Sequence, residues 1–253
     1  MYSNFRAFFR LIIFILYTIP TVAIGVFTMY IAPHKLHMAI VRRWLKATLC
    51  LLGFKVTVKG TPVTEDGVLF VSNHCSYMDV LVMGANVTVY FTPKKDVRSW
   101  PFINILVALS KPLYIDRMNR NTLSSQMQQI RGYINNDRSI VLYPEGTTDN
   151  GYDILPFKSS LFGILDDGDI NVQPVTIIYP RCGKSELKKD KYSPIAWVGD
   201  MSLVPHLWGL FKNKDAEAIV IFHEFAEPSE FESRKDIANY CQSVIQKPFE
   251  EYR

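Results

Sequence analysis

The stretch VSNHCSYMDV, residues 71–80, contains a histidine and an aspartate whose types and spacing could support catalysis. The imidazole of His74 can accept a proton near neutral pH. Asp79, five positions later, could accept the other ring N–H, fix the tautomer and stabilise the imidazolium. Ser76 and Asp79 also match the S-x-x-D pattern of a helix capping box, which by itself would account for Asp79. The stretch therefore predicts either a catalytic pair or a structural turn between a strand and a helix.

Two further polar clusters follow apolar runs and could bind a substrate. Arg117, in IDRMNR, offers a guanidinium group that suits a phosphate, although a solvated surface arginine fits the same pattern. Glu145, Gly146 and Thr147 form an acidic turn in which the glycine lets a ligand approach the backbone and the threonine adds a hydroxyl. An ordinary glycine turn beside a helix cap is the alternative interpretation.

Several reaction classes lack their signature motifs in this chain. The sequence contains no G-x-S-x-G, no Walker A loop, no G-x-G-x-x-G and no H-E-x-x-H. Its four cysteines have no C-x-x-C spacing, so we expect neither a metal site nor disulfides. The net charge of +4 is too small to indicate nucleic acid binding. A general base without a protein nucleophile implies that the nucleophile belongs to the substrate.

The elements that would position these side chains alternate between strands and helices. The predicted strands are 54–60, 67–73, 88–95, 111–117, 139–143, 172–180 and 217–225, and the predicted helices are 35–53, 79–85, 100–110, 122–134, 156–165 and 233–252. This alternation predicts a single α/β domain over residues 36–253, with a mixed, mostly parallel central sheet flanked by helices. Ligands bind where the strands of such sheets end, and His74, Arg117 and Glu145 all lie at predicted strand ends.

Residues 1–35 are predicted to form an N-terminal membrane segment. Positions 11–32 contain no charged residue, and a helix of this length spans about 33 Å, close to the thickness of the hydrocarbon core. Pro20 favours a kink or a re-entrant hairpin, and basic residues flank both sides, so a single span and a hairpin fit equally well. A signal peptide is the alternative, but the apolar run is longer than usual and lacks a good cleavage site.

Residues 35–53 are predicted to form an amphipathic helix with a basic face. The apolar residues share one half of a helical wheel, whereas Lys35, Arg42, Arg43 and Lys46 gather on the other half. Such a helix could lie at an anionic lipid surface or pack on the domain, and the sequence favours neither.

Four blocks, NHCSYMD, PLYIDR, YPEGTT and VQPV, occur in an order that resembles the glycerolipid acyltransferase family, whose archetype is lysophosphatidic acid acyltransferase. The resemblance covers roughly residues 36–225. The longer string YPEGTTDNGYDILPFKSSLFGIL is similar to the bacterial branch that includes lyso-ornithine lipid acyltransferases. The second block lacks the glycine that often precedes its hydrophobic residues, so the resemblance is weakest at the acceptor pocket.

The resemblance implies a role for each candidate residue. His74 would deprotonate the free hydroxyl of a lysolipid, Asp79 would hold and charge-balance the imidazole, and Arg117 would bind the phosphate of the acceptor. The acceptor site would be shaped by Glu145, Gly146 and Thr147. The co-substrate would be acyl-CoA or acyl-carrier protein, with no cofactor and no metal, and the enzyme would work at the membrane, on the cytoplasmic face of the inner (plasma) membrane.

These implications favour a 1-acylglycerol-3-phosphate (lysophosphatidic acid) O-acyltransferase that makes phosphatidic acid. The first alternative is a lyso-ornithine lipid O-acyltransferase, which would use the same chemistry on another acceptor. The second alternative, from a different class, is a catalytically silent membrane lipid-binding protein, and intact His74 and Asp79 count against it.

Overall fold

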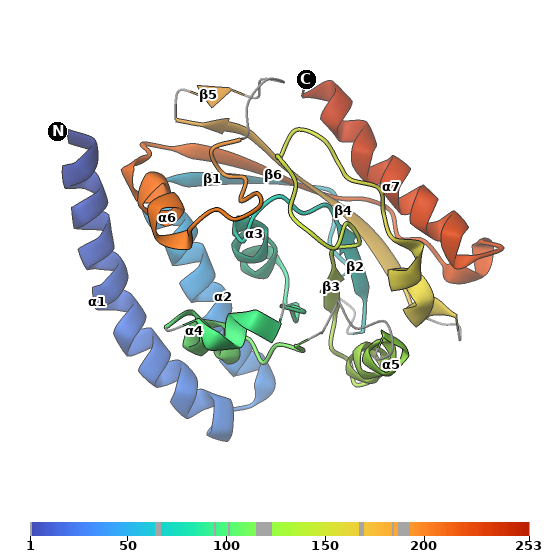
Figure 1. Cartoon of the computed structure of the whole chain (residues 1–253). Coiled ribbons are helices and arrows are strands. Elements are labelled where there is room, and N and C mark those ends of the chain that lie inside the picture. Colours follow the sequence, from blue (N-terminus) through green and yellow to red (C-terminus); the bar gives the residue numbers. More distant parts are fainter. Residues whose placement is uncertain are drawn as a thin grey trace.

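The computed structural model describes residues 2–63, 67–93, 95–100, 102–114, 123–166, 170–183, 185–186 and 193–252. Strands and helices alternate along most of the chain (Figure 1). In chain order the elements are α1 (Tyr2–Ile31), α2 (His34–Leu51), β1 (Phe54–Lys59), β2 (Leu69–Ser72), α3 (Met78–Asn86), η1 (Lys95–Ser99), α4 (Ile103–Leu109), α5 (Leu123–Ile134), β3 (Ile140–Leu142), η3 (Ser159–Leu165), β4 (Val172–Cys182), β5 (Ser185–Glu186), α6 (Leu203–Lys212), β6 (Ala216–Phe222), η4 (Pro228–Glu230) and α7 (Arg234–Glu251).

The strands form one sheet in the order β1-β6-β4-β2-β3, with the short β5 paired to β4. β1 runs parallel to β6, and β2 runs parallel to both β3 and β4, whereas β4 and β6 are antiparallel. β2 and β3 are buried along their whole length because both faces of the sheet are covered. The predicted α/β fold with a mixed, mostly parallel sheet is confirmed.

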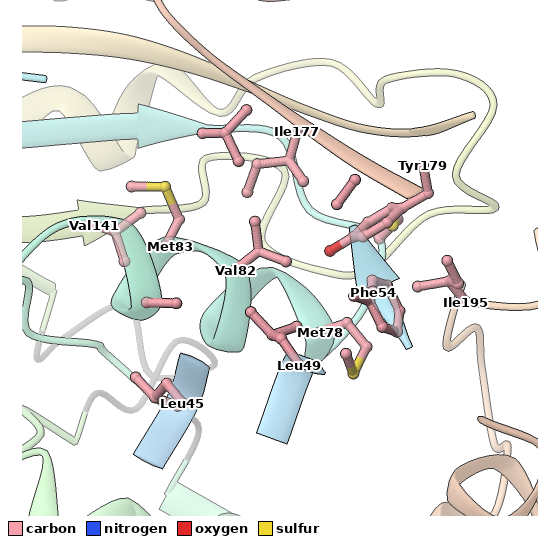
Figure 2. Close-up of a cluster of buried hydrophobic side chains, with 14 of the residues drawn as sticks. Leu45, Leu49, Phe54, Met78, Val82, Met83, Val141, Ile177, Tyr179 and Ile195 are labelled. Carbon is pink, nitrogen blue, oxygen red and sulfur yellow. The ribbon is translucent and has the colours of Figure 1, made fainter. Parts of the chain in front are cut away.

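Apolar side chains fill the space on both faces of the sheet. Along β2, Phe70 belongs to a cluster shared with α2 and α3, whereas Leu69 and Val71 belong to a cluster shared with α5 and α7. This alternation is the period of two that an extended strand imposes. Figure 2 shows the first cluster, in which Val82 of α3 lies among apolar side chains that include Ile177 of β4. The sheet is therefore covered on both faces and supports the residues that follow its strand ends.

α1 is a single helix that continues through Pro20. A re-entrant hairpin would need the helix to break within residues 11–32, and α1 has no such break. Instead, α1 and α2 turn at Ala32 and Pro33 and pack against each other as an antiparallel pair (Figure 1). By length and composition, the segment Ser3–Ile31 could cross a membrane, a test that core helices and signal sequences also pass. The division into residues 1–35 and 36–253 stays a prediction.

The predicted amphipathic helix is α2, and its apolar side packs on the domain. Met38, Val41, Leu45 and Leu49 are buried, and α2 contacts α1, α3 and β1. The Arg42 guanidinium donates to the Asn86 carbonyl at the end of α3 (3.0 Å). Of the two interpretations that the sequence left open, packing on the domain is the one observed.

The strand predicted at 88–95 is wrong, and the strand predicted at 111–117 is described only in part. Residues 88–93 form no regular strand, and Tyr90 makes a single isolated bridge to Ile140. Pro93 lacks the N–H that a longer ladder would need. Residues 111–114 have no regular structure, and the remainder of the strand predicted at 111–117 lies outside the described residues.

Two helical segments also differ from prediction. η3 is a 3₁₀ helix where an α-helix was expected over residues 156–165. α6 was not predicted because Pro205 and Gly209 are poor helix formers. Pro205 lies in the first turn of α6, where a missing N–H costs no helical hydrogen bond.

Candidate active site

The candidate site lies where the parallel strands β2 and β3 end. β2 ends at Ser72 and α3 begins at Met78, so residues 73–77 turn the chain from strand to helix. The Asn73 side chain fixes this turn on β4, because its Nδ2 donates to the Ile177 carbonyl (2.9 Å) and its Oδ1 accepts from the Ile177 N–H (2.8 Å). The glutamate turn follows β3, so parallel pairing brings two of the predicted clusters together.

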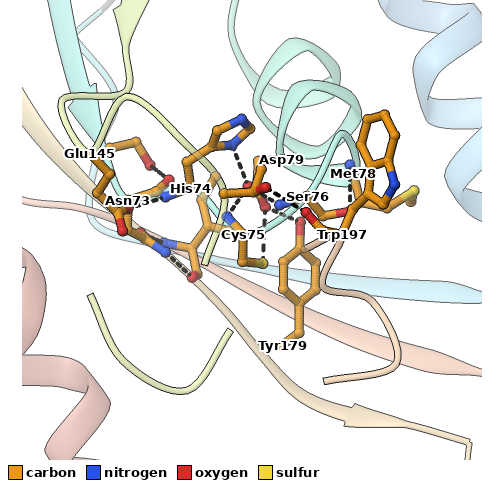
Figure 3. A network of polar contacts seen from close by, with 12 residues as sticks. Asn73, His74, Cys75, Ser76, Met78, Asp79, Glu145, Tyr179 and Trp197 are labelled. Carbon is orange, nitrogen blue, oxygen red and sulfur yellow. Dashed lines mark hydrogen bonds and ion pairs between the residues drawn. The ribbon is translucent and has the colours of Figure 1, made fainter. Parts of the chain in front are cut away.

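His74 and Asp79 face each other across the turn (Figure 3). His74 Nδ1 lies 2.8 Å from Asp79 Oδ2, and the Asp79 side chain is fully buried whereas that of His74 is 16% exposed. Because a carboxylate can only accept, we assign the proton in this contact to Nδ1 and the lone pair to Nε2. The imidazole ring also stacks on the Tyr143 ring, with centroids 4.1 Å apart. The ring is therefore held with Nε2 as the nitrogen that can accept a proton.

Asp79 accepts hydrogen bonds from four further donors. Oδ2 accepts from the N–H groups of Cys75 (2.8 Å) and Ser76 (2.9 Å), and Oδ1 accepts from the Tyr179 hydroxyl (2.7 Å) and from the weaker Cys75 thiol donor (3.8 Å). In a capping box, the acidic side chain accepts a hydrogen bond from the N–H of the N-cap residue, and the Ser76 to Asp79 bond is of this kind. α3 nevertheless begins one residue later than a box at Ser76 would predict. Asp79 therefore belongs both to the start of α3 and to the His74 contact.

Glu145 supports the same turn from the segment after β3. Its Oε1 accepts from the His74 N–H (2.6 Å) and its Oε2 accepts from the Leu155 N–H (2.8 Å). The side chain is buried, and this burial raises the pKa of Glu145 to about 8, although the two N–H bonds lower it. Glu145 positions the His74 backbone, whereas its expected part in binding an acceptor stays a prediction.

The other predicted binding residues surround this turn only in part. Gly146 has φ +73°, and a Cβ added there would lie 2.6 Å from the Lys158 Nζ, so the glycine allows the amine to approach. Thr147 is exposed beside it. Arg117 lies outside the described residues. The roles of Gly146, Thr147 and Arg117 in binding stay predictions.

Two residues near His74 were missed from the sequence. The backbone N–H of Trp197 donates to the Cys75 carbonyl (2.8 Å), which ties a distant loop to the turn. Tyr179 ends the buried run of β4, and a hydroxyl in such a strand needs a polar partner, which was the available signal. Burial and the nearby Asp79 carboxylate raise the pKa of Tyr179, so its hydroxyl remains a donor.

Within the part of the chain that the structure describes, no group of three or more His, Cys, Asp or Glu side chains is placed to hold a metal ion. Two surface hollows, of about 530 and about 700 Å³, lie beside α7 and β6 and are lined by none of the predicted site residues. The expectation that neither a metal nor a cofactor is needed stays a prediction.

Comparisons with known proteins come from sequence and from structure. A family model described as Acyltransferase matches residues 55–178. The chain is 32% identical over 213 residues to the lyso-ornithine lipid O-acyltransferase of Rhizobium meliloti (strain 1021), a match that covers 81% of this chain and 73% of that protein. It is 27% identical over 203 residues to the 1-acyl-sn-glycerol-3-phosphate acyltransferase of Neisseria gonorrhoeae, covering 79% of this chain and 76% of that protein.

A similar solved structure is that of the 1-acyl-sn-glycerophosphate (LPA) acyltransferase PlsC from Thermotoga maritima. The TM-score is 0.70 at 19% sequence identity, over 98% of this chain and 94% of that chain. At this identity the match supports the fold alone.

The Tyr179 hydroxyl is predicted to stabilise the protein through the Asp79 carboxylate. Tyr179→Phe should lower the free energy of unfolding by about 1.5–3 kcal/mol, because a buried carboxylate oxygen loses its donor. Tyr90→Phe is the matched control, since it removes a hydroxyl that bonds the exposed His34 instead. Denaturant unfolding in detergent measures both, and a loss for Tyr179→Phe no larger than that for Tyr90→Phe would contradict the prediction.

The protonation of Glu145 is predicted to make stability depend on pH. Its pKa is about 8 in the folded protein and near 4.5 in the unfolded chain, so the native state binds the extra proton between these values. The free energy of unfolding should therefore fall as pH rises from about 5 to 8. Glu145→Gln should flatten this slope, and Glu230→Gln, at an exposed position of η4, should not. Equal slopes for the wild type and Glu145→Gln would exclude this effect.

Proposed function

Because the chain belongs to the acyltransferase family, we propose that it transfers a fatty acyl group from a thioester donor to the free hydroxyl of a membrane lysolipid. The donor would be acyl-CoA or acyl-carrier protein. The single observation that carries this proposal is the contact between His74 Nδ1 and the buried Asp79 carboxylate, at 2.8 Å, which leaves Nε2 as the proton acceptor.

His74 acts as the general base in the proposed reaction. Nε2 takes the proton of the acceptor hydroxyl as its oxygen attacks the thioester carbonyl carbon. Asp79 stabilises the imidazolium that forms, because its Oδ2 already accepts from Nδ1. The carbon–sulfur bond then breaks, and the imidazolium returns the proton to the departing thiolate. One ester forms, one thioester is lost, and His74 regains its starting state.

This base contributes only part of the rate enhancement. A positioned base typically supplies about 10²–10⁴-fold, so orientation and stabilisation of the oxyanion must supply the rest. The turn contributes to orientation, since the Asn73, Glu145 and Trp197 contacts hold the backbone on both sides of His74.

Lysophosphatidate is the first candidate acceptor, which would make the enzyme a 1-acylglycerol-3-phosphate O-acyltransferase. The resemblance of the four blocks and the relative from Neisseria gonorrhoeae support it. Its phosphate would bind Arg117, with the Lys158 amine beside Gly146 as a second cation.

Lyso-ornithine lipid is the second candidate acceptor, and one local observation favours it. The Asp149 N–H donates to the His74 carbonyl (3.0 Å), so Asp149 lies beside the base. Among the described residues, Asp149 Oδ2 is buried without a hydrogen-bond partner. The amine of an ornithine head group would supply the missing donor. The relative from Rhizobium meliloti carries this activity in its name.

Working at a membrane follows from this choice of acceptor. α1 is apolar and largely exposed along its length, which suits residence in lipid where the lysolipid already lies. The donor would arrive from the cytosol, so we place the site on the cytoplasmic face of the inner (plasma) membrane.

The experiment that tests the function crosses two donors with two acceptors on the purified enzyme. Acyl-CoA and acyl-carrier protein are each supplied with lysophosphatidate and with lyso-ornithine lipid, and product formation is followed with labelled acyl chains. We expect transfer to at least one acceptor, and faster turnover with lyso-ornithine lipid would place it first. No transfer in any arm, with the protein folded, would favour a silent lipid-binding protein.

Variants in the same assay separate catalysis from folding. His74→Ala should lower kcat at least 10²-fold, because the base is lost. Asp79→Asn should also lower kcat steeply, since an amide keeps most of the contacts but cannot balance the imidazolium charge. His223→Gln is the matched control, because His223 bonds Thr176 and should leave turnover unchanged. If kcat of His74→Ala equalled that of the wild type, the proposed mechanism would be wrong.

A further inference from the structure

Beyond α1, exposed apolar side chains gather just before and on α4 and at the start of α6. Its exposed side chains are those of Phe102 (80%), Ile105 (46%), Met201 (37%) and Val204 (77%), here called the α4–α6 surface. Scattered apolar side chains are ordinary on a protein surface, whereas a cluster of large ones indicates a contact surface. The question is what covers it.

Phe102 is the most informative member of the α4–α6 surface. It has φ +65° and ψ −43°, a combination that a bulky residue rarely adopts and that costs on the order of 1–3 kcal/mol. This backbone turns the chain into α4 and leaves the phenyl ring exposed rather than in the core. Strain that holds a large apolar side chain away from the core is expected where that side chain has a partner.

The sequence around this surface contains no charge. Residues 99–110 and 201–211 are uncharged throughout, although both segments lie at the surface. Of the four residues that directly flank these segments, Arg98, Lys111 and Lys212 are basic and Asp200 is acidic. An uncharged apolar surface whose flanking residues are mostly basic matches the acyl and anionic headgroup layers of a membrane.

The helices that carry the α4–α6 surface are neighbours of α1. α4 and α6 both pack on α1 (Figure 1). Phe14 of α1 meets Phe211 of α6 with ring centroids 5.8 Å apart. Gly25 of α1 lets α4 approach closely, since a Cβ there would lie 3.1 Å from Leu109. The α4–α6 surface therefore belongs to helices that flank the candidate membrane segment.

Two tryptophans connect this surface to the turn that carries His74. The Trp197 ring contacts the rings of Trp100 and Tyr77, each at 5.5 Å between centroids. The Trp197 backbone N–H donates to the Cys75 carbonyl (2.8 Å), and the indole Nε1 donates to the Met201 carbonyl (2.7 Å). Tryptophan is enriched at the boundary between lipid and water. The surface and the site are thus parts of one packed unit.

We propose that the α4–α6 surface is a second contact with the lipid bilayer, distinct from α1, which sets the height and tilt of the His74 site at the headgroup layer. A helix such as α1 fixes position in the membrane but leaves rotation about its axis free. A second contact removes that freedom and presents Nε2 to a lysolipid hydroxyl that stays in its leaflet. The catalytic consequence depends on the proposed lipid acceptor, whereas the contact itself does not.

A spin label tests the contact without reference to activity. The label is placed at Phe102→Cys or, as control, at Phe225→Cys, in a Cys50→Ser background, because the other three cysteines are buried. The full chain is bound to vesicles of phosphatidylethanolamine and phosphatidylglycerol, and relaxation by oxygen and by a water-soluble nickel chelate is compared. We expect the label at 102 to be reached mainly by oxygen, and the label at 225 mainly by nickel.

Two results of this experiment would overturn the proposal. In the first, the label at 102 would be as accessible to nickel as the label at 225. In the second, two labels at 102 would broaden each other strongly in vesicles, which would identify a second copy of the chain as the partner that covers the surface.

Kinetics test the orienting role with a matched pair of double variants. Phe102→Ser with Val204→Ser should lower kcat/KM at least tenfold toward a long-chain acceptor in vesicles, and less than twofold toward a short-chain acceptor dissolved in water. Val58→Ser with Phe225→Ser removes two exposed apolar side chains elsewhere and should change neither value. Equal losses toward both acceptors would overturn the orienting role. Failure of the wild type with both acceptors would refute the proposed function and leave the label result to stand alone.

Discussion

A buried carboxylate, that of Asp79, is the interaction on which the site depends. Removing a carboxylate from water costs several kcal/mol unless protein donors replace the lost hydration. Here the nitrogen and oxygen donors are an imidazole, two backbone N–H groups and the Tyr179 hydroxyl. Three of them come from the turn and one comes from β4, so the carboxylate is satisfied only when the turn lies on the sheet. The bonds that offset the cost of burying Asp79 also fix the orientation of the His74 imidazole.

The two acidic side chains at the turn are buried in different ways. Asp79 has four nitrogen and oxygen donors, whereas Glu145 has two backbone N–H groups and a pKa raised to about 8. Near neutral pH Glu145 therefore keeps its proton for much of the time and adds little negative charge beside His74. An anionic acceptor would therefore meet less repulsion than two charged carboxylates would produce. The hydrogen bond from the His74 backbone N–H to Glu145 is retained.

The sheet and the core of the site could be predicted because their signals are local. β2, β3 and β4 are rich in apolar residues, and His74 and Asp79 lie five residues apart just after β2. Tyr179 could not be assigned, because the residue it serves lies 100 positions earlier and no periodicity connects them. The strand expected at 88–95 failed at Pro93, and α6 was missed because its proline falls where a helix tolerates one. Sequence patterns thus predicted the His74–Asp79 pair, which the structure brings into contact, but not the distant side chains that hold it.

β4 also imposes an order on biosynthesis. It supplies Ile177 to anchor Asn73 and Tyr179 to hold Asp79, so the turn at residues 73–77 lacks its supports until a segment about 100 residues further on has been made. α1, by contrast, is made well before β4, so under the proposed function it can engage lipid while the turn still lacks its supports. Pairings of such large sequence separation form late in folding, and a chain interrupted before Val172 would lack the β4 partners of both Asn73 and Asp79.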